Sequence, residues 1–561
     1  MDQLKLFGIE FNLIKLSIVT AIVSTAVFYL GLDLAYLFDW DEVNFAEASR
    51  EMLVSKDYLK VKINYEPFWE KPPLFFWLQI LSYKCFGVNE MAARLPNVLF
   101  GTITLLFILY IGQSIKNLKF AFFWTLCLGG SLLPHFYYKT GLIDPVLNTF
   151  IFISITFLYK YYQRYEGQNK KHFHILLSGF FAGLATLTKG PIAILIIVPC
   201  WIAFSFIYKK IFKIDFIAVI IFILIYILSA GSWFLYDLAL HGPQFFFDFL
   251  EYQIRLFETK DAGHGGPFYY HFIVLFLGTF PSSIFIYKSI RPQANDCAEI
   301  KMFKTWMSIL LIWVLIIFSI VQTKIVHYSS LAYLPISFLS AYVLDHLDIK
   351  SMHFTKILRY IYIGLCSIFI FTLMGLTIVG NNLDRIMPYI KEEIQLKLSG
   401  QNIDWPLYEL IIPSIFMMVC IFVYRHFKRG QVRSATYILF GSSFVLITLV
   451  YTLSFHKIIQ YSQGGLVTIS KSLVNKDAYV STFGFKSYAH YFYTNKPDRK
   501  ESILKIEPEK RPYNLLRLKV DKEVYMIVKS HRSSEFEKKY DQFTKINESF
   551  GFSLFYKPIQ K

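Results

Sequence analysis

The stretch DWDEVNFAEASR (residues 39–50) places three carboxylates directly after the first long apolar run of the chain. From Asp41 onward the spacing of apolar residues predicts a helix. One face of this helix carries Asp41, Phe45, Ala48 and Met52, and another carries Asn44, Glu47, Arg50 and Glu51. We expect the helix to lie on a membrane surface.

The three acids differ in what their positions imply. Asp39 has the spacing of a helix N-cap, and Glu42 that of the residue that reaches back to it. Asp41 projects from the apolar face, where an unpaired carboxylate is costly unless it meets water or a cation. Asp41 is therefore the candidate functional residue.

Composition defines the class of protein. Of the 561 residues, 55% are hydrophobic and 19% aromatic, which exceeds what a soluble globular chain carries. The net charge of +17 comes from short Lys and Arg clusters between apolar runs. That placement indicates membrane topology and not nucleic-acid binding.

Apolar runs long enough to cross a membrane recur along most of the chain. They predict about thirteen spans, near residues 12–32, 92–114, 119–138, 142–162, 174–190, 191–208, 212–236, 268–288, 303–321, 328–344, 355–380, 408–425 and 435–456. Residues 457–561 alternate short strands with polar segments and predict a small α/β domain outside the membrane. We expect a polytopic all-α membrane domain over residues 1–456, with an external loop at 33–91.

Orientation follows from the basic loops. The clusters fall at 160–172, 208–213, 301–304 and 425–433, which is one side of the membrane. The bias of Lys and Arg toward the cytoplasm then places the N-terminus inside. The loop 33–91, the loop 237–267, the loop 381–407 and the C-terminal domain are expected outside.

A second constellation lies in YEPFWEKPPLFFWLQIL (residues 65–81). Glu70 and Lys71 precede a proline pair that can begin a helix. Lys71 has the option of snorkelling to lipid headgroups. Two successive charges held before Pro72 and Pro73 favour a functional role instead.

Seven segments in order resemble one family. They read WDEVNFAEASREML, FWEKPPLFFWLQ, FGVNEMAARLP, LIDPVLNTF, LATLTKGPIA, HGGPFYYH and TKIVHYSSLAYLP. Together they are similar to the membrane glycosyltransferases of the aminoarabinose transferase and protein O-mannosyltransferase superfamily, with the lipid A 4-amino-4-deoxy-L-arabinose transferases nearer. The likeness covers residues 33–340.

This resemblance implies a C-type glycosyltransferase fold with two juxtamembrane helices in the first external loop and a periplasmic C-terminal domain. It also implies a multi-pass enzyme of the bacterial inner membrane whose donor is a sugar on undecaprenyl phosphate. By motif, Asp41 is the catalytic or acceptor-orienting carboxylate and Lys71 contacts the donor phosphate.

The resemblance leaves a divalent metal open. Glu70 matches a candidate metal ligand, and some relatives add a His shortly before an Arg to hold zinc. Here Tyr252, in LEYQIRLF (residues 250–257), is near that place. This tyrosine departs from the zinc pattern and weighs against zinc, so a divalent metal, zinc or magnesium, stays open, with His264 or His271 as substitute ligands.

The implied reaction expels a phosphate monoester, so cations must meet the charge that develops on oxygen. Lys71, Arg255 and Lys324 lie near helix ends on the external side. Lys189 and Arg94 are weaker candidates, because both positions also suit side chains that face lipid headgroups.

The role of Asp41 depends on the acceptor. A hydroxyl needs a general base, whereas a phosphate is already ionised, and Asp41 would then orient a cationic group. A single displacement would invert the anomeric carbon. Asp144 is a candidate partner that either caps its helix or pairs with a Lys or Arg. Tyr269, Tyr270, Tyr328 and Tyr333 are aromatic candidates for substrate binding.

The sequence leaves four functions to compare. The leading one is transfer of a sugar, hexose or pentose, to lipid A or another envelope glycan. The second is protein O-glycosylation from the same donor. A transporter would need charges near the midplane of several spans. A structural protein would leave Asp41 on an apolar face without explanation.

Overall fold

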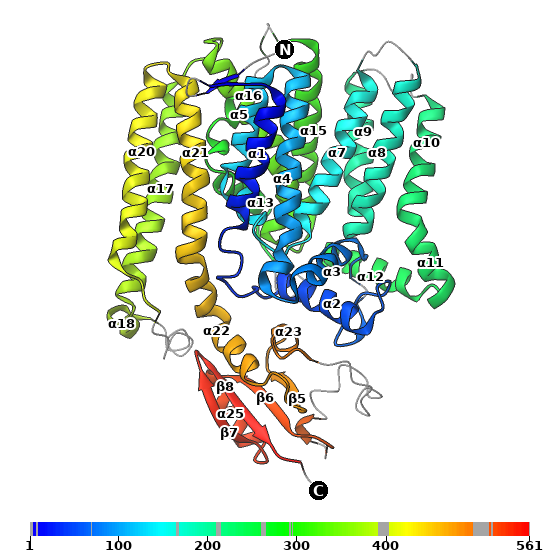
Figure 1. The fold of residues 1–561 in the computed structure, drawn as a ribbon, viewed down its shortest axis with the longest axis vertical. Coiled ribbons are helices and arrows are strands. Elements are labelled where there is room, and N and C mark those ends of the chain that lie inside the picture. Colours follow the sequence, from blue (N-terminus) through cyan, green and yellow to red (C-terminus); the bar gives the residue numbers. More distant parts are fainter. Residues whose placement is uncertain are drawn as a thin grey trace.

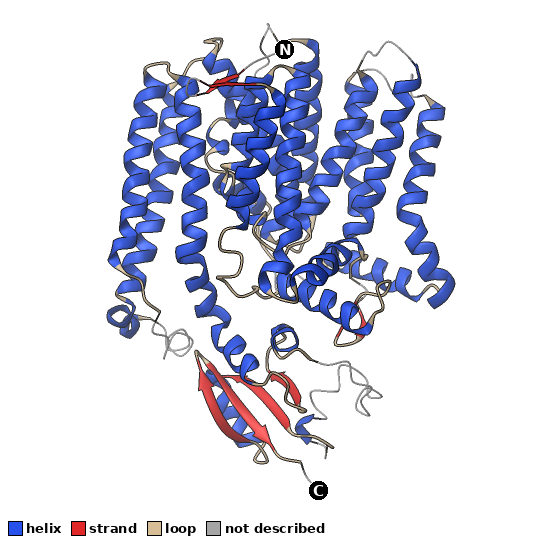
Figure 2. Cartoon of the chain, viewed as in Figure 1, coloured by secondary structure: helices blue, strands red, loops and turns tan. Residues whose placement is uncertain are grey.

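The structure is a computed structural model of the 561-residue chain. It describes residues 4–6, 9–68, 70–163, 168–208, 215–259, 265–290, 293, 296–390, 403–496, 515–517 and 520–559. Most of these residues form long helices packed side by side, with a small sheet beyond one end of the bundle (Figures 1 and 2). The chain is a polytopic membrane protein.

The long helices follow the apolar runs. They are α1 (Leu13–Tyr29), α4 (Glu90–Ile115), α5 (Leu118–Gly129), α7 (Asp144–Tyr162), α8 (Gln168–Lys189), α9 (Ile192–Ile207), α10 (Phe216–Tyr226), α15 (Ala298–Ile320), α16 (Tyr333–Asp348), α17 (Lys356–Asn381), α20 (Ile411–Lys428) and α21 (Val432–Val450). Two continue through π-helical turns: α10 through Ile227–Gly231 into α11 (Ser232–His241), and α21 through Tyr451–Phe455 into α22 (His456–Ser472). Among the described residues, six segments are long and apolar enough to cross a membrane: 90–115, 216–240, 298–320, 356–381, 407–428 and 432–472.

Each predicted span contains helix, but two are broken. The expected span 119–138 divides into α5 and α6 (Leu132–Tyr137), and 268–288 divides into α13 (Tyr270–Gly278) and α14 (Ile286–Ser289). At the first break, a Cβ on Gly130 would lie 2.6 Å from the carbonyl oxygen of Phe440, so only glycine permits this close approach. The number of thirteen spans stays a prediction.

Short elements gather at the lower end of the bundle in Figure 1. They are α2 (Asp41–Ser55), the hairpin of β3 (Lys62–Ile63) and β4 (Glu66–Pro67), α3 (Leu74–Phe86), α12 (Gln244–Glu258) and α18 (Leu383–Ile386). The N-terminal hairpin of β1 (Leu4–Leu6) and β2 (Ile9–Phe11) lies at the opposite end. The segments expected outside the membrane therefore lie at one common end.

The C-terminal sheet has the order β5-β6-β8-β7. Its strands are β5 (Tyr479–Phe483), β6 (Val524–Lys529), β7 (Thr544–Ser549) and β8 (Phe552–Lys557), and only β5 and β6 pair in parallel. Along β6, Tyr525 and Ile527 pack toward α22 and α23 (Ala489–Tyr493), whereas Val524, Met526 and Val528 pack toward α25 (Ser533–Lys539). This period of two matches a strand covered on both faces.

The segments AYVSTFGF (residues 478–485), VYMIVKS (524–530) and FSLFYK (552–557), whose sequences predict short strands, correspond to β5, β6 and β8. The prediction missed β7, because its sequence TKINES is polar and its side chains are largely exposed at the sheet edge. The predicted limit between the two domains falls at the start of α22, which runs from the bundle to the sheet without interruption. The division at residue 457 stays a prediction.

A buried ion pair fixes the start of α2. Nε and Nη2 of Arg94 donate to the two carboxylate oxygens of Glu42 at 2.8 and 2.9 Å, and both side chains are fully buried. The remaining Arg94 protons go to the carbonyls of Leu32, Ala35 and Tyr36. The headgroup-facing role considered for Arg94 is therefore wrong.

Glu42 also replaces the predicted cap. Its carboxylate accepts from the backbone N–H groups of Phe38 and Gly141, and the N-cap position of α2 is Trp40, which makes no side-chain capping bond. The N-cap role predicted for Asp39 is wrong. Glu42 instead joins α4, the segment before α2 and the loop before α7.

The helix α2 lies at the lower end of the bundle (Figure 1), but its polar face is not exposed, since every residue of α2 from Glu42 to Met52 is buried. Its polar face finds partners inside the protein. Arg50 donates two bonds of 2.7 Å to Glu47, and Glu51 accepts from the N–H groups of Asn64 and Tyr65 at 2.6 Å. The polar face therefore packs against the β3–β4 hairpin and not against water.

Replacing Arg94 with Met should destabilise the protein by about 3–5 kcal/mol, because it leaves the Glu42 carboxylate buried and unpaired. Thermal unfolding in detergent would show a lower midpoint. The double variant Arg94→Met, Glu42→Gln removes both charges and should regain part of the loss. Equal midpoints for the wild type and Arg94→Met would contradict this account.

Candidate active site

Three ionisable side chains from distant segments meet at the lower end of the bundle. Asp41 begins α2, Asp144 begins α7, and His327 lies in the 3₁₀ helix η5 (Val326–Ala332). The His327 Nε2 atom is 3.2 Å from Oδ2 of Asp41 and 3.7 Å from Oδ2 of Asp144. His327 thus bridges the two carboxylates.

Two lysines complete the group. The Lys189 Nζ atom, at the last residue of α8, is 2.6 Å from Oδ1 of Asp144. The Lys71 Nζ atom is 3.9 Å from Glu70 and 3.5 Å from the Tyr252 hydroxyl, and the lysine is only 7% exposed. We call Asp41, Lys71, Asp144, Lys189 and His327 the charged cluster.

The helix ends explain why these charges gather here. Asp41 and Asp144 each occupy a helix N-terminus, where the macrodipole favours an anion, and Lys189 occupies a C-terminus, where it favours a cation. After Lys189 the chain turns at Gly190, whose φ of 84° suits glycine. Local helix geometry therefore places each charge before tertiary packing brings them together.

The charges around Asp41 determine its ionisation. Burial by itself would raise the pKa of Asp41, but the hydrogen bond from His327 and the positive charges of His327, Lys71 and Lys189 lower it to about 2. Asp41 is then ionised at neutral pH and weakly basic. It is suited to holding a cation or a polar substrate group more than to removing a proton.

For Lys71, unlike Asp41, burial outweighs the neighbouring charges of opposite sign. Burial lowers the pKa of Lys71, and the charge of Lys189 lowers it further, whereas Glu70, Asp41 and Asp144 raise it. A buried ammonium with three acidic neighbours still gains strongly from an additional anion. The cluster thus offers a phosphate group a binding partner at the membrane boundary.

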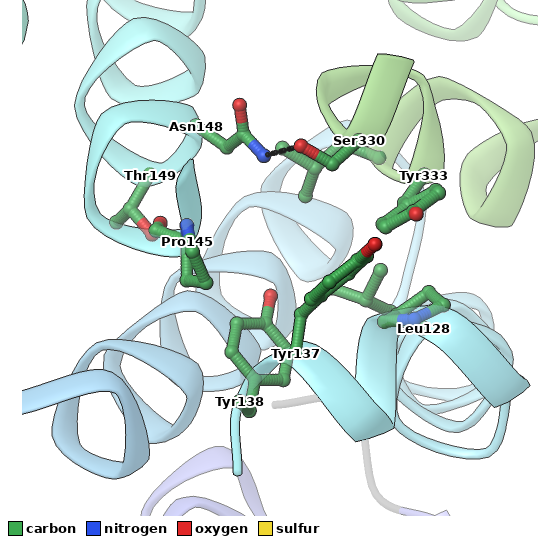
Figure 3. A pocket seen from close by; sticks show the side chains of 10 residues that line it. Leu128, Tyr137, Tyr138, Pro145, Asn148, Thr149, Ser330 and Tyr333 are labelled. Atoms are coloured by element: carbon green, nitrogen blue, oxygen red, sulfur yellow. Dashed lines mark hydrogen bonds between the residues drawn. The ribbon is translucent and has the colours of Figure 1, made fainter. Parts of the chain in front are cut away.

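A small pocket of about 20 Å³ (Figure 3) is lined by Pro145, which follows Asp144 on α7, and by Ser330, which lies on η5 with His327. Tyr137 and Tyr333 stack at 6.0 Å on one side, and Asn148 donates to the Ser330 hydroxyl at 2.8 Å on the other. This volume holds about one water molecule. A sugar must therefore approach the cluster from another direction.

Two of the predicted cations, Lys324 and Arg255, contact residues other than Asp41. The Lys324 ammonium donates to the carbonyls of Phe318, Ser319 and Val321 at 2.5–2.8 Å, which satisfies the C-terminus of α15. Arg255 is exposed on α12 and lies 5.2 Å from the centre of the Tyr252 ring. Arg255 is thus linked to Lys71 through the shared Tyr252, whereas Lys324 caps a helix.

The predicted tyrosines also differ in whether they contact the charged cluster. Tyr328 follows His327, and the Lys189 ammonium lies 5.1 Å from its ring centre. Tyr270 is half-buried at the start of α13 beside His271, and Tyr269 is 58% exposed. Tyr328 therefore contacts the charged cluster, whereas Tyr269 faces outward.

The residues around Glu70 do not fit a metal site. Within the described part of the chain, no group of three His, Cys, Asp or Glu side chains is arranged to hold an ion. Glu70 faces the Lys71 ammonium, and His271 bonds the Ser329 hydroxyl at 3.0 Å. His264 lies outside the described residues.

Three residues predicted from the sequence, Asp41, Lys71 and Asp144, lie together in the structure with His327, which the prediction did not include. The expectation that Asp144 pairs with a neighbouring Lys is confirmed by Lys189. His327 lies in the quoted segment TKIVHYSSLAYLP, three residues after Lys324. Its bond to Asp41 joins residues far apart in the sequence, so spacing gave no signal beyond a histidine near the external end of a span.

Apolar helices and a charged cluster at one end of their bundle define the class as a polytopic membrane protein. The fold matches the crystal structure of ArnT from Cupriavidus metallidurans bound to undecaprenyl phosphate, with a TM-score of 0.77 and 16% identity over 96% of this chain and 97% of that chain. Residues 17–249 match the family model of dolichyl-phosphate-mannose-protein mannosyltransferases.

Several curated proteins are also similar to this chain in sequence. An uncharacterised protein of Aquifex aeolicus is 27% identical over 341 residues, which is 59% of this chain and 64% of that protein. An undecaprenyl phosphate-alpha-4-amino-4-deoxy-L-arabinose arabinosyl transferase of Pectobacterium carotovorum is 26% identical over 59% of this chain and 60% of its own length. The aligned region spans less than two thirds of either relative. These matches confirm the family resemblance predicted from the sequence.

Replacing His327 with Ala should move the acid limb of activity to higher pH. Without the His327 bond and charge, burial raises the pKa of Asp41, so its carboxylate is lost earlier as pH falls; Lys71 and Lys189 remain as the opposing charges. The ratio of rates at about pH 5 and pH 8 should drop relative to the wild type.

The matched control is His353→Ala, an exposed histidine at the other end of α16. Parallel pH profiles for His327→Ala and the control would show that His327 does not set the charge of Asp41.

Proposed function

We propose that this protein is a glycosyltransferase of the bacterial inner membrane that moves a sugar from a polyprenyl phosphate, such as undecaprenyl phosphate, to an envelope acceptor such as lipid A or another glycan. The observation that carries the proposal is the charged cluster. Its buried lysines and its ionised Asp41 meet at the bundle end that also bears the juxtamembrane helices.

The cluster suits the chemistry of the donor. In this reaction the bond between the anomeric carbon and the phosphate oxygen breaks, and a bond to the acceptor oxygen forms. The polyprenyl phosphate leaves as a monoester whose new charge needs a cation. Lys71 is assigned to that phosphate, with Arg255 beside it across Tyr252 and Lys189 behind it.

Asp41 is assigned to orientation and not to proton removal. Its pKa of about 2 makes it a poor general base near neutral pH. An acceptor phosphate is already ionised and needs no base, whereas a donor amine or another cation would bind an ionised Asp41 well. One displacement of this kind inverts the anomeric carbon.

Protein O-glycosylation is the second candidate, supported by the description of the matching family model. A serine or threonine hydroxyl must lose its proton, and neither an Asp41 with a pKa of about 2 nor a His327 that donates to it is suited to accept that proton, so this candidate ranks second. A transporter is disfavoured, because the cluster lies at helix ends and not at midplane.

The proposal includes a topology of thirteen spans with a cytoplasmic N-terminus and a periplasmic C-terminal domain. It is supported by the common end shared by α2, α3, α12 and the sheet, opposite the N-terminal hairpin. No step depends on a metal, and Glu70 is assigned to Lys71 and Tyr252. Activity that persists in EDTA is the expected result.

The variant Asp41→Asn should lower transfer by about a hundredfold or more while leaving the protein folded, because it removes the negative charge and keeps the shape. The assay supplies radiolabelled undecaprenyl phosphate sugar to the purified protein with envelope acceptors and identifies the labelled product. Asp57→Asn, on the loop after α2, is the control. Near-normal transfer by Asp41→Asn would overturn the assignment.

The variant Lys71→Ala should raise the KM for the donor about tenfold to a hundredfold, because a charge-assisted bond to phosphate is worth about 1.5–3 kcal/mol. Initial rates at varied donor concentration measure this, with Lys62→Ala on β3 as the control. An unchanged dependence on donor concentration would exclude Lys71 from the phosphate site.

A further inference from the structure

The C-terminal sheet closes directly onto the residue before Asp41. Trp40 stacks on Tyr488, which precedes α23, with ring centres 5.9 Å apart and an interplanar angle of 28°. The Lys486 ammonium lies 5.1 Å from the Trp40 ring centre and 5.4 Å from that of Tyr488. Both rings are half-buried and Lys486 is exposed, so an aromatic surface with a cation faces outward.

A second lysine borders this surface. Lys529, at the end of β6, lies 5.2 Å from the Phe485 ring, and its charge acts on Asp39. Among the described residues neither Lys486 nor Lys529 forms an ion pair, whereas nearby Arg532 is held by Glu535 at 2.9 and 3.0 Å. Lys486 therefore presents its positive charge at the surface, and Lys529 shares its charge with the neighbouring Asp39 carboxylate.

Asp39 is the acidic group at this place, and it is exposed. A hydrogen bond with Ser487 and the positive charge of Lys529 both act on its carboxylate. Lys529 therefore offsets part of the repulsion that Asp39 exerts on an approaching anion.

Hydrogen bonds join the segment before α2 to α22 and α23. The Gln463 side chain of α22 donates to the carbonyl of Leu37 and accepts from the N–H of Asp39 at 3.1 Å. The N–H of Leu37 donates to the Tyr493 hydroxyl at 2.9 Å. These bonds hold the aromatic surface in register with the start of α2.

We propose that the seam formed by Trp40, Lys486, Tyr488 and Lys529 binds the phosphorylated sugar headgroup of the acceptor. The inference rests on the proposed function and assigns the acceptor side of the same site. The flat faces of a sugar ring pack on aromatic rings, and its phosphate pairs with the two lysines.

The position of the seam suits this role. Trp40 and Asp41 are consecutive, so their Cα atoms lie about 3.8 Å apart. The backbone therefore joins the seam directly to the residue that begins the charged cluster, while Lys71 belongs to the donor phosphate. Donor and acceptor then meet Asp41 from separate groups of residues.

The test is the double variant Lys486→Glu, Lys529→Glu in the full-length protein in nanodiscs. The acceptor probe is bisphosphorylated lipid A, and its dephosphorylated form is the comparison. The KM for bisphosphorylated lipid A should rise at least about tenfold, because two charge-assisted bonds to its phosphate are lost. The KM for the donor and the rate of donor hydrolysis by water should change less than about twofold, because the donor lysine is untouched.

The matched control is Lys538→Glu, Lys539→Glu on α25, which makes the same charge change on an exposed helix away from the seam. Tyr488→Ala supplies a second variant without charge change and should raise the same KM.

An acceptor KM equal to that of the control would overturn the inference while the proposed function stands. Transfer by the wild type to a serine peptide and not to lipid A would also overturn it. Absence of any transfer or hydrolysis of the donor by the wild type would instead defeat the proposed function.

Discussion

A fully buried ion pair between Glu42 and Arg94 is the constraint on which the site depends. Arg94 donates hydrogen bonds to three backbone carbonyls in the segment before α2. Glu42 accepts from two backbone N–H groups, one of them in the loop before α7. The pair therefore fixes where α2 begins relative to α4 and α7. Because Asp41 adjoins Glu42, the same contacts set the position of the candidate catalytic carboxylate.

Around that position the fold places charges at helix ends instead of inside helices. Asp41 and Asp144 begin helices and Lys189 ends one, so each gains from the backbone dipole. His327 joins the two acids. This arrangement keeps ionised groups at the boundary of an apolar bundle, where a lipid-borne phosphate and a polar acceptor can both arrive.

The sequence predicted the bundle well because hydrophobic length is a local property. It also singled out Asp41, Lys71 and Asp144, which the structure brings near one another, since each is a charge beside an apolar run that lacks a local explanation. It did not predict His327, whose partner lies far away in the chain.

The errors in the prediction have a common physical origin. Helical periodicity separated the two faces of α2 correctly but could not show that the polar face is buried, because its partners Asn64 and Tyr65 belong to a later hairpin. For the same reason, Arg94 and Lys324 looked like cations available to lipid or substrate. Both side chains instead donate hydrogen bonds to backbone carbonyls that lie near them only in the folded chain.

The most direct measurement is an experimental structure of the protein with undecaprenyl phosphate bound. If the charged cluster is the donor site, the phosphate should lie within hydrogen-bond distance of the Lys71 ammonium. That ammonium should also have moved away from the Tyr252 hydroxyl. A phosphate bound elsewhere, with Lys71 still against Tyr252 and Glu70, would contradict the central claim.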